Sequence, residues 1–193
     1  MDFKDSKTYQ NLINSFAGES QARGRYYFYA EVAEKEGYYH VRDIFHETGD
    51  NELEHAKVFY DHLIEKGCEG VIHVDSGYPL SVGSTAENLK AAADGEYEEF
   101  IDLYKQAAID AEEEGYDDIA ESFQEILEVE ERHYERYMKL WELVRDKKYF
   151  KRDHKVYWKC GNCGYVHEGE EAPETCPACK HAQKYFEVTS LQE

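Results

Sequence analysis

Two copies of one helix–turn–helix unit follow each other in the sequence, and this duplication restricts the fold more than any other feature. The first copy contains AEKEGYYHVRDIFHETGDNELEH at residues 33–55, and the second contains AEEEGYDDIAESFQEILEVEERH at residues 111–133. Each segment ends on the same motif; the two motifs are Glu52-x-x-His55 and Glu130-x-x-His133. Two tandem helical hairpins predict a four-helix bundle.

The spacing between the copies is not constant. The helices that carry the Glu-x-x-His motifs match with a shift of 78 residues, whereas the segment that places Gly18-Glu19 on Gly95-Glu96 matches with a shift of 77. One extra residue therefore lies between Glu96 and Tyr104, inside the third helix. A single inserted residue in a long helix is commonly accommodated as a π-bulge, often at a functional site, so we predict a π turn there.

A long connection joins the two halves. Residues 67–85, GCEGVIHVDSGYPLSVGST, contain Gly, Pro and β-branched residues without helical periodicity. Ser84 with Glu87 forms a capping-box pattern that predicts the start of the third helix. A connection of this length allows the second and third helices to run parallel. The predicted fold is therefore mainly α, a ferritin-like four-helix bundle with one long crossover.

Carboxylates and imidazoles interrupt the apolar stripe of each predicted helix. The predicted inward positions in the third helix include Leu89, Ala92, Leu103 and Ala107. The ionisable side chains on the inward faces of the four helices are Glu19, Glu52, His55, Glu96, Glu99, Glu130 and His133. A lone Glu or His on such a face is usually a boundary or hydrogen-bonded core residue, but here these residues recur together. One Glu from each of two helices with Glu-x-x-His from the other two is the arrangement of di-iron carboxylate bundles.

Charge explains why these residues need metal. Several carboxylates buried together without cations would cost many kcal/mol, and they would become protonated instead. Four glutamates supply four negative charges, which match two Fe(II) ions. Oxygen and imidazole ligands suit iron or manganese. Glu99 is a fifth carboxylate without a counterpart in the first helix. It is either a solvated helix residue or a ligand that binds when oxidation raises the charge of the metal pair.

The C-terminal part has a different composition and a different metal motif. The bundle is assigned to residues 1–146, a linker to 147–154 and a small domain to 155–193. Its two Cys-x-x-Cys pairs, Cys160 with Cys163 and Cys176 with Cys179, predict a tetrahedral Cys₄ site. The spacing alone favours structural zinc. The local forms C-x-x-C-G-Y and C-P-x-C instead favour a rubredoxin-type site that holds one iron.

Composition excludes several classes of partner. The net charge of −20 argues against nucleic acid and anionic membranes. No window approaches the ~18 apolar residues of a membrane span, and the N-terminal segment lacks the apolar run of a signal peptide, so we expect a cytoplasmic protein. The remaining cysteine, Cys68, is interpreted as a free thiol.

The chain resembles the rubrerythrin family over essentially its whole length. The residues that carry the resemblance are AGESQAR at 17–23, the two Glu-x-x-His motifs, Gly95-Glu96 with Glu99, and CGNCGYVHEG followed by CPAC. The resemblance implies a di-iron centre, a rubredoxin-type iron centre, and reduction of hydrogen peroxide. It also implies a homodimer and NAD(P)H-linked electron supply through a redox protein, rubredoxin or its reductase.

The same resemblance implies roles for individual residues of the site. The implied di-iron ligands are Glu19, Glu52, Glu96, Glu99, Glu130, His133 and, in the reduced state, His55. One iron is expected to exchange Glu99 for His55, which gives these two residues catalytic roles. Tyr26 and Tyr104 match the family's tyrosines beside the ligands, although either is equally interpretable as a core tyrosine.

Two other classes of function compete with the peroxidase hypothesis. Iron storage with ferroxidase activity predicts a large cage, and the appended Cys₄ domain argues against it. A structural or regulatory protein with a zinc ribbon predicts a colourless protein that carries zinc on its four clustered cysteines.

Overall fold

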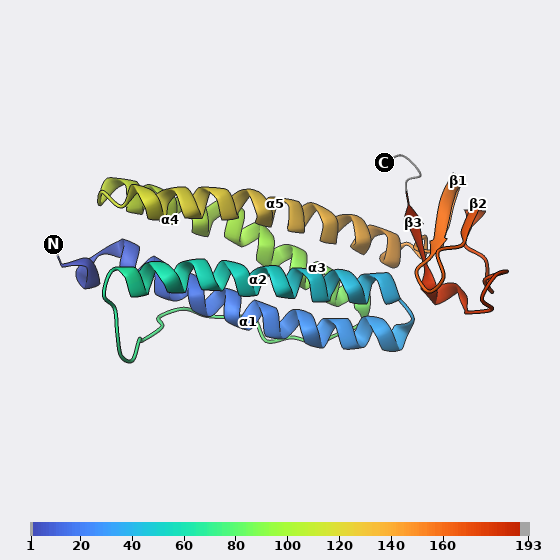
Figure 1. The fold of residues 1–193 in the computed structure, drawn as a ribbon, viewed down its shortest axis with the longest axis horizontal. Coiled ribbons are helices and arrows are strands. Elements are labelled where there is room, and N and C mark those ends of the chain that lie inside the picture. The colour runs from blue at the N-terminus through green and yellow to red at the C-terminus, as the bar shows by residue number, and fades with distance from the viewer. Residues whose placement is uncertain (1, 190–193) are drawn as a thin grey trace.

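The computed structural model describes residues 2–189 as a long helical bundle with a small β domain at one end (Figure 1). The helices of the first half are α1 (Lys7–Glu36) and α2 (Tyr39–Glu65), preceded by a short 3₁₀ turn, η1 (Phe3–Asp5). The second half contains α3 (Thr85–Glu98), the π turn η2 (Glu99–Leu103), α4 (Tyr104–Glu113) and α5 (Asp117–Arg145). Because α3, η2 and α4 form one continuous helix, the predicted four-helix bundle is confirmed.

Two glycines and a capping box fix where several of the helices begin and end. Gly37 and Gly115 end α1 and α4 with φ of +85° and +81°, a left-handed conformation that glycine adopts without a steric penalty. The capping box between Ser84 and Glu87 begins α3. The crossover then runs back along the bundle, so α2 and α3 point in the same direction (Figure 1). The expected one-crossover topology is therefore present.

The π turn lies where the change of repeat spacing predicts it. Its last hydrogen bond runs from the N–H of Tyr104 to the carbonyl of Glu99, an i to i+5 bond. The predicted inward position of Leu103 is wrong, because Leu103 is 52 % exposed and its neighbour Tyr104 is 2 % exposed. The wide turn advances the helical phase by one residue, so that the residue after Leu103 faces the core.

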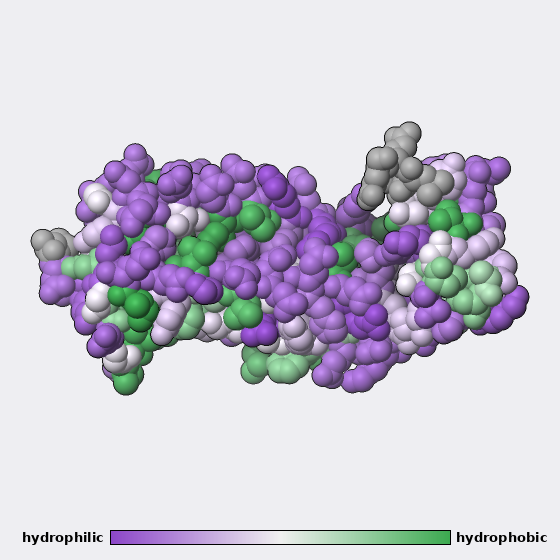
Figure 2. Space-filling view, viewed as in Figure 1, coloured by the Kyte–Doolittle hydropathy of each residue, from purple (hydrophilic) through white to green (hydrophobic). Residues whose placement is uncertain are grey.

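The bundle interior consists of two apolar clusters separated by polar residues. One cluster, toward the β domain, includes Tyr26, Phe45 and Tyr137. The other, toward the opposite end, includes Leu12, Phe59 and Phe123. The charged inward residues of the four helices fall between these clusters, at mid-bundle. The face of the molecule shown in Figure 2 is mostly hydrophilic, in agreement with the net charge. Within residues 2–189 no helix combines the length and apolar character needed to cross a bilayer.

The small domain contains a three-stranded antiparallel sheet in the order β2-β1-β3. Its elements are β1 (Lys151–Cys160), β2 (Val166–Glu171), the 3₁₀ turn η3 (Gln183–Tyr185) and β3 (Phe186–Thr189). Its small core includes Trp158 and Phe186 beside two of the cysteines. The strand β1 begins within residues 147–154, the stretch that the sequence analysis assigns to a linker. The domain boundaries themselves stay predictions. Residues 190–193 of the predicted small domain lie outside the described residues.

The two parts of the chain contact each other at the start of α2. His40 Nδ1 lies 2.7 Å from Glu187 Oε2, across the junction. The ring of Tyr39 packs edge-on against Tyr185 at 4.8 Å, and the ammonium group of Lys184 lies 4.6 Å above the Tyr39 ring. The β domain is therefore held against the bundle by both polar and aromatic contacts.

Candidate metal centres

Six buried side chains from four helices meet at mid-bundle. Their ligand atoms form two overlapping groups, within each of which all atoms lie within 4.8 Å of one another. The first group contains Glu19 of α1, Glu52 and His55 of α2, and Glu130 of α5; the second contains Glu52, Glu96 of α3, Glu130 and His133 of α5. Two residues, Glu52 and Glu130, belong to both groups. Two four-ligand sites that share two carboxylates are the arrangement needed for a bridged metal pair.

The four glutamates are almost completely removed from solvent, with exposed fractions of 0–1 %. His55 Nδ1 lies 2.7 Å from Glu130 Oε1 and 2.9 Å from Glu52 Oε2, and His133 Nδ1 lies 2.8 Å from Glu130 Oε2. Most of these contacts are not aligned as hydrogen bonds. Among the described residues, the buried atoms of this cluster that lack a hydrogen-bond partner are Glu19 Oε2, both Glu52 oxygens, His55 Nδ1, Glu96 Oε2 and Glu130 Oε1.

These unpaired atoms test whether the cluster suits a metal pair. Leaving several buried oxygens without a partner carries a desolvation penalty for each of them. Cations placed between them would satisfy the lone pairs and neutralise the charge together. The donor set of carboxylate oxygens and imidazole nitrogens is the set that iron or manganese prefers. The residues therefore fit two divalent ions, for a reason independent of any similarity to other proteins.

Burial and mutual repulsion dominate the protonation of the cluster. Burial, with repulsion from neighbouring carboxylates, raises the pKa of Glu19, Glu52 and Glu96 well above the usual range. Burial also acts on Glu130, but its contacts with His133 and His55 outweigh that effect and lower its pKa to about 2. Without cations, protons would therefore neutralise most of these carboxylates, as the sequence argument anticipates.

Two tyrosines hold carboxylates of the cluster in a crossed arrangement. The hydroxyl of Tyr26 on α1 donates to Glu96 of α3, and the hydroxyl of Tyr104 on α4 donates to Glu19 of α1. Burial raises the pKa of both phenols well above the usual value, so both remain donors. Each half of the duplicated bundle therefore fixes a carboxylate of the other half.

Glu99 lies beside the cluster and belongs to neither four-residue group. It is less buried than the other carboxylates and borders a cavity of about 310 Å³. The same cavity is lined by Gly18, Gly95 and Tyr104 of the helices and by Tyr78 of the crossover. Burial, followed by repulsion from Glu130, raises the pKa of Glu99 to about 8. The structure thus places His55 among the potential ligands and Glu99 at the edge, next to the cavity.

Two arginines near the cluster were not singled out by sequence. Burial raises the pKa of Glu99 and Glu52, and Arg25, next to Tyr26 in the chain, partly opposes this rise at both residues; Arg136 also opposes it at Glu52. Arg136 donates to Glu47 at 2.6 Å and to the hydroxyl of Thr48 at 2.8 Å. The sequence could have indicated that Arg136 lies near the cluster, because it follows His133 by three positions, one turn along the same helix.

The four cysteines of the Cys-x-x-Cys pairs meet at a single point in the β domain. Cys160 Sγ lies 3.8 Å from Cys179 Sγ, and Cys163 Sγ lies 3.7 Å from Cys176 Sγ. These separations are far longer than the roughly 2.05 Å of a disulfide and close to the about 3.8 Å edge expected for a tetrahedron of thiolates around one metal. The backbone N–H of His181 lowers the pKa of the Cys179 thiol to about 6, which favours the thiolate. Cys68 is buried outside this cluster and has no disulfide partner, in agreement with its interpretation as a free thiol.

The profile of the Rubrerythrin family matches residues 10–141, and that of the rubrerythrin rubredoxin-like domain matches residues 158–187. Rubrerythrin of Clostridium perfringens (strain 13 / Type A) is 47 % identical over 186 residues, which cover 96 % of this chain and 95 % of that protein. The chain belongs to the rubrerythrin family. Rubrerythrin of Porphyromonas gingivalis (strain ATCC BAA-308 / W83) is 49 % identical over 185 residues, covering 95 % of this chain and 90 % of that protein.

Solved structures agree with this assignment. A structure of nigerythrin in a mixed-valence state superposes with a TM-score of 0.65 at 29 % identity, and covers 96 % of this chain and 90 % of that chain. Rubrerythrins carry a di-iron site in the ferritin-like domain and an iron on four cysteines in the rubredoxin-like domain, and this chain presents a matching cluster of side chains for each. The predicted cofactors, fold class and family membership are thus confirmed.

Proposed function

We propose that this rubrerythrin reduces hydrogen peroxide to water at the mid-bundle cluster. The observation that carries the proposal is the sharing of Glu52 and Glu130 between two ligand groups, because residues arranged in this way would hold two metal ions. Cleaving H₂O₂ to two water molecules consumes two electrons and two protons. Two adjacent ferrous ions, when bound, supply both electrons to the same O–O bond, whereas a single ferrous ion supplies one and releases hydroxyl radical.

The proposed roles of the surrounding residues follow from their positions. The ligands are Glu19, Glu52, Glu96, Glu130, His133 and either His55 or Glu99. With His55 among the ligand atoms and Glu99 at the edge, the arrangement corresponds to the ligand set expected of the reduced centre. On oxidation Glu99 would replace His55 and add one negative charge. Tyr26 and Tyr104 hold Glu96 and Glu19 in fixed orientations.

Peroxide would reach the cluster through the cavity that Glu99 borders. The cavity lies between α1, the π turn and the crossover, and its wall contains polar side chains such as Asn14 and Gln21. With a pKa near neutrality, Glu99 is suited to hold and transfer a proton at the point where the cavity meets the cluster.

Electrons would return through the Cys₄ domain. From His133 to the end of α5 at Arg145 the helix alone spans ~18 Å, at ~1.5 Å per residue, before the β domain begins. A second subunit that places its Cys₄ domain beside this cluster would shorten the path, which supports the proposal of a homodimer. The proposed electron source is NAD(P)H through rubredoxin or its reductase, and the proposed location is the cytoplasm.

Rapid mixing of the anaerobically reduced protein with hydrogen peroxide tests the proposal. We expect fast oxidation of the bundle irons in the wild type, with two electrons consumed per peroxide. Glu52→Ala should slow this step by about 100-fold or more, because it removes a carboxylate shared by both ligand groups. The matched control is Glu54→Ala, an exposed glutamate two residues further along α2, which should react like the wild type. Equal rates in the wild type and Glu52→Ala would refute the proposed site.

A further inference from the structure

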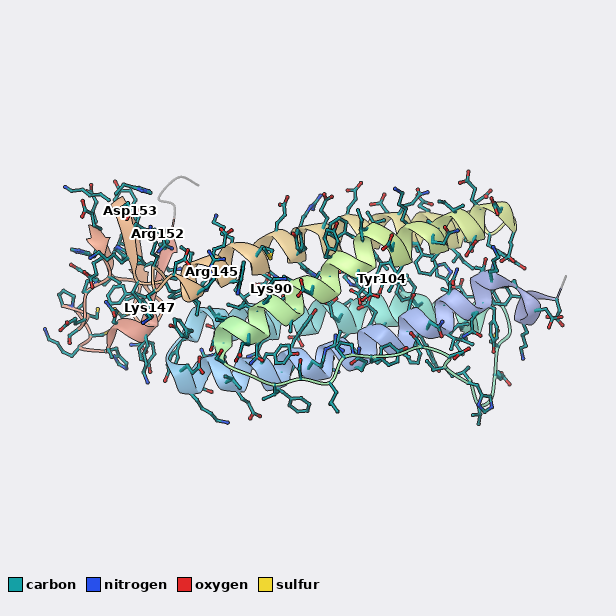
Figure 3. The ribbon with its side chains drawn as sticks, turned by 180° about the vertical axis from the view of Figure 1, so that it is seen from behind. Lys90, Tyr104, Arg145, Lys147, Arg152 and Asp153 are labelled. Carbon is teal, nitrogen blue, oxygen red and sulfur yellow. The ribbon has the colours of Figure 1, made fainter. Side chains whose placement is uncertain are left out.

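A second cavity lies where the bundle meets the Cys₄ domain, and none of the proposed metal ligands borders it. Its volume is about 530 Å³, and it lies among α2, α5, β1 and β3. Arg152, one of its lining residues, is seen at this junction, far along the molecule from Tyr104 in the middle of the bundle (Figure 3). The volume is within the range of about 300–1,000 Å³ that is typical of small-molecule sites.

The charge of this junction cavity is opposite to that of the molecule. Arg136, Lys139 and Arg152 line it and are cationic, while Glu142 is its one carboxylate among the described residues. The chain as a whole has 42 acidic and 22 basic residues. A concave surface with a local excess of positive charge attracts and retains an anion, even on an acidic protein.

Two polar groups in the wall of the junction cavity are buried without a partner. Tyr149 is 5 % exposed, and its hydroxyl makes no hydrogen bond to the described part of the chain. The Nε–H of Arg136 is also buried and unpaired, although the other end of the same guanidinium group binds Glu47 and Thr48. A buried donor without a partner carries a desolvation penalty, and an anionic oxygen in the cavity would satisfy such donors.

Two histidines, His40 and His154, also line the junction cavity, and the rest of its wall is apolar. Its apolar side chains are Ile44, Leu140 and Leu143 from the bundle and Val156 and Val188 from the sheet. Inorganic ions gain nothing from such a surface. A ligand with a hydrocarbon or aromatic part would bury that part here and so bind more tightly than its anionic group alone.

We propose that the junction cavity binds a small organic anion, a phosphate or carboxylate group attached to an apolar or aromatic body. The anionic group would lie near Arg136, Lys139 and Tyr149, and the body would lie between α5 and the sheet. Because the lining residues come from both parts of the chain, the ligand would hold the Cys₄ domain against the bundle. The proposal does not rest on the proposed peroxidase reaction.

Calorimetric titration of the iron-loaded protein at low ionic strength tests the proposal with three probes: adenosine 5′-monophosphate, benzoate and inorganic phosphate. We expect saturable 1:1 binding of at least one of the two organic anions, at least about tenfold tighter than that of inorganic phosphate. The two organic probes distinguish a phosphate ester from a carboxylate. Binding of phosphate as tight as that of both organic anions, or no saturable binding of any probe, would refute the proposal.

Three charge changes locate the site. Lys139→Gln should weaken binding of the organic anion by about five- to tenfold, and Glu142→Gln should strengthen it by a similar factor, since they remove opposite charges from the wall. The matched control is Lys105→Gln, which removes an equally exposed helical lysine from α4, outside the cavity. An equal loss of affinity in Lys139→Gln and Lys105→Gln would mean that only the net charge matters and would overturn the assignment.

Discussion

The tyrosines beside the cluster show that helical periodicity predicts which face of a helix a residue occupies but not its hydrogen-bond partner. Helical spacing places Tyr26 on the inward face of its helix, two turns after Glu19, and the resemblance to rubrerythrins adds Tyr104. Neither the spacing nor the resemblance predicts that each tyrosine hydroxyl donates to a carboxylate in the other half of the duplicated bundle. Periodicity assigns a residue to a face, whereas a partner depends on the distances between helices, and these are set by packing of the two apolar clusters.

Removing one of these phenols should loosen the cluster without unfolding the bundle. Tyr104→Phe deletes the hydroxyl that donates to Glu19, and we expect iron affinity or the rate of oxidation by peroxide to fall by about 10–100-fold, the usual effect of losing a group that orients a metal ligand. Iron analysis and stopped-flow absorption measure the two quantities. Tyr137→Phe is the control, because Tyr137 is equally buried but donates to none of the carboxylates. Similar losses in both variants would contradict the role assigned to Tyr104.

The ion pair across the domain junction gives a second prediction, on pH. Hydrogen bonding to His40 lowers the pKa of Glu187 below its usual 4.5. A lowered folded-state pKa stabilises the fold above the unfolded-state pKa, and this contribution is lost as the pH falls through the folded-state value. Glu187→Gln should therefore cost about 0.5–1 kcal/mol at pH 6, and the difference from the wild type should be smaller at pH 3.5, below the usual pKa of a glutamate.

Scanning calorimetry of the wild type and Glu187→Gln at both pH values measures this difference. The control is Glu170→Gln on β2, an exposed carboxylate for which we expect no change at either pH. A difference between the wild type and Glu187→Gln that stays constant down to pH 3.5 would mean that the carboxylate charge is not the stabilising feature.

Among the elements, the π turn is the part of the fold where simple helical periodicity was misleading. The change in repeat spacing locates the insertion, but a constant ~3.6 residues per turn beyond it wrongly predicts that Leu103 faces inward. A wide turn shifts every later residue by one position, so that Tyr104 takes the place that Leu103 would hold. The caps and the crossover were predictable, because they depend on local residues: Gly37, Gly115 and the Ser84–Glu87 pair.

Deleting Asp102 should convert the third helix into a regular α-helix. The spacing from Glu96 to Tyr104 is 8 residues, whereas the equivalent spacing from Glu19 to Tyr26 is 7, so the deletion restores the phase of the first half. We expect a folded bundle that still binds two irons. Oxidation by peroxide should be at least about tenfold slower, because Glu99 loses the widened turn that positions it.

Circular dichroism, iron analysis and stopped-flow absorption test these three expectations together. Deletion of Asp94 is the contrasting variant, since this exposed residue lies on α3 before Glu96, where no π turn can absorb the loss. A shift of ~100° between Leu89 and Glu96 should then unfold the bundle or abolish iron binding. Wild-type rates after deletion of Asp102 would show that the π turn is not needed for the reaction.

For the molecule as a whole, the sequence predicted the parts better than their assembly. Both metal clusters are identified by ligand types at fixed spacings, and the duplication predicts a bundle. The junction was not predicted, because contacts such as Tyr39 on Tyr185 join residues that are far apart in the chain and follow no period. The same holds for the junction cavity, whose cations come from α5 and β1. Each of these cations alone looks like an ordinary surface residue.

The separation of the two parts leads to a prediction that distinguishes chemistry from electron supply. Cys176→Ala removes one of the four thiolates, and a domain with so small an apolar core depends on its metal to fold. The bundle has its own two apolar clusters and should keep its helices and its metal pair. We therefore expect a single oxidation by peroxide of the chemically reduced variant to proceed within about twofold of the wild-type rate. Steady-state turnover with a protein electron donor should fall by about 100-fold or more, because the variant lacks the proposed return path for electrons.

The measurement compares single-turnover absorption changes with multiple-turnover peroxide consumption in the same preparation. Cys68→Ala is the control, because this buried thiol lies outside the four-cysteine cluster and should leave both rates unchanged apart from a small loss of stability. If Cys176→Ala lost the single turnover as well, the bundle would depend on the Cys₄ domain for its own structure. If steady-state turnover survived, electrons would reach the mid-bundle cluster directly from the donor, and the Cys₄ domain would have another role.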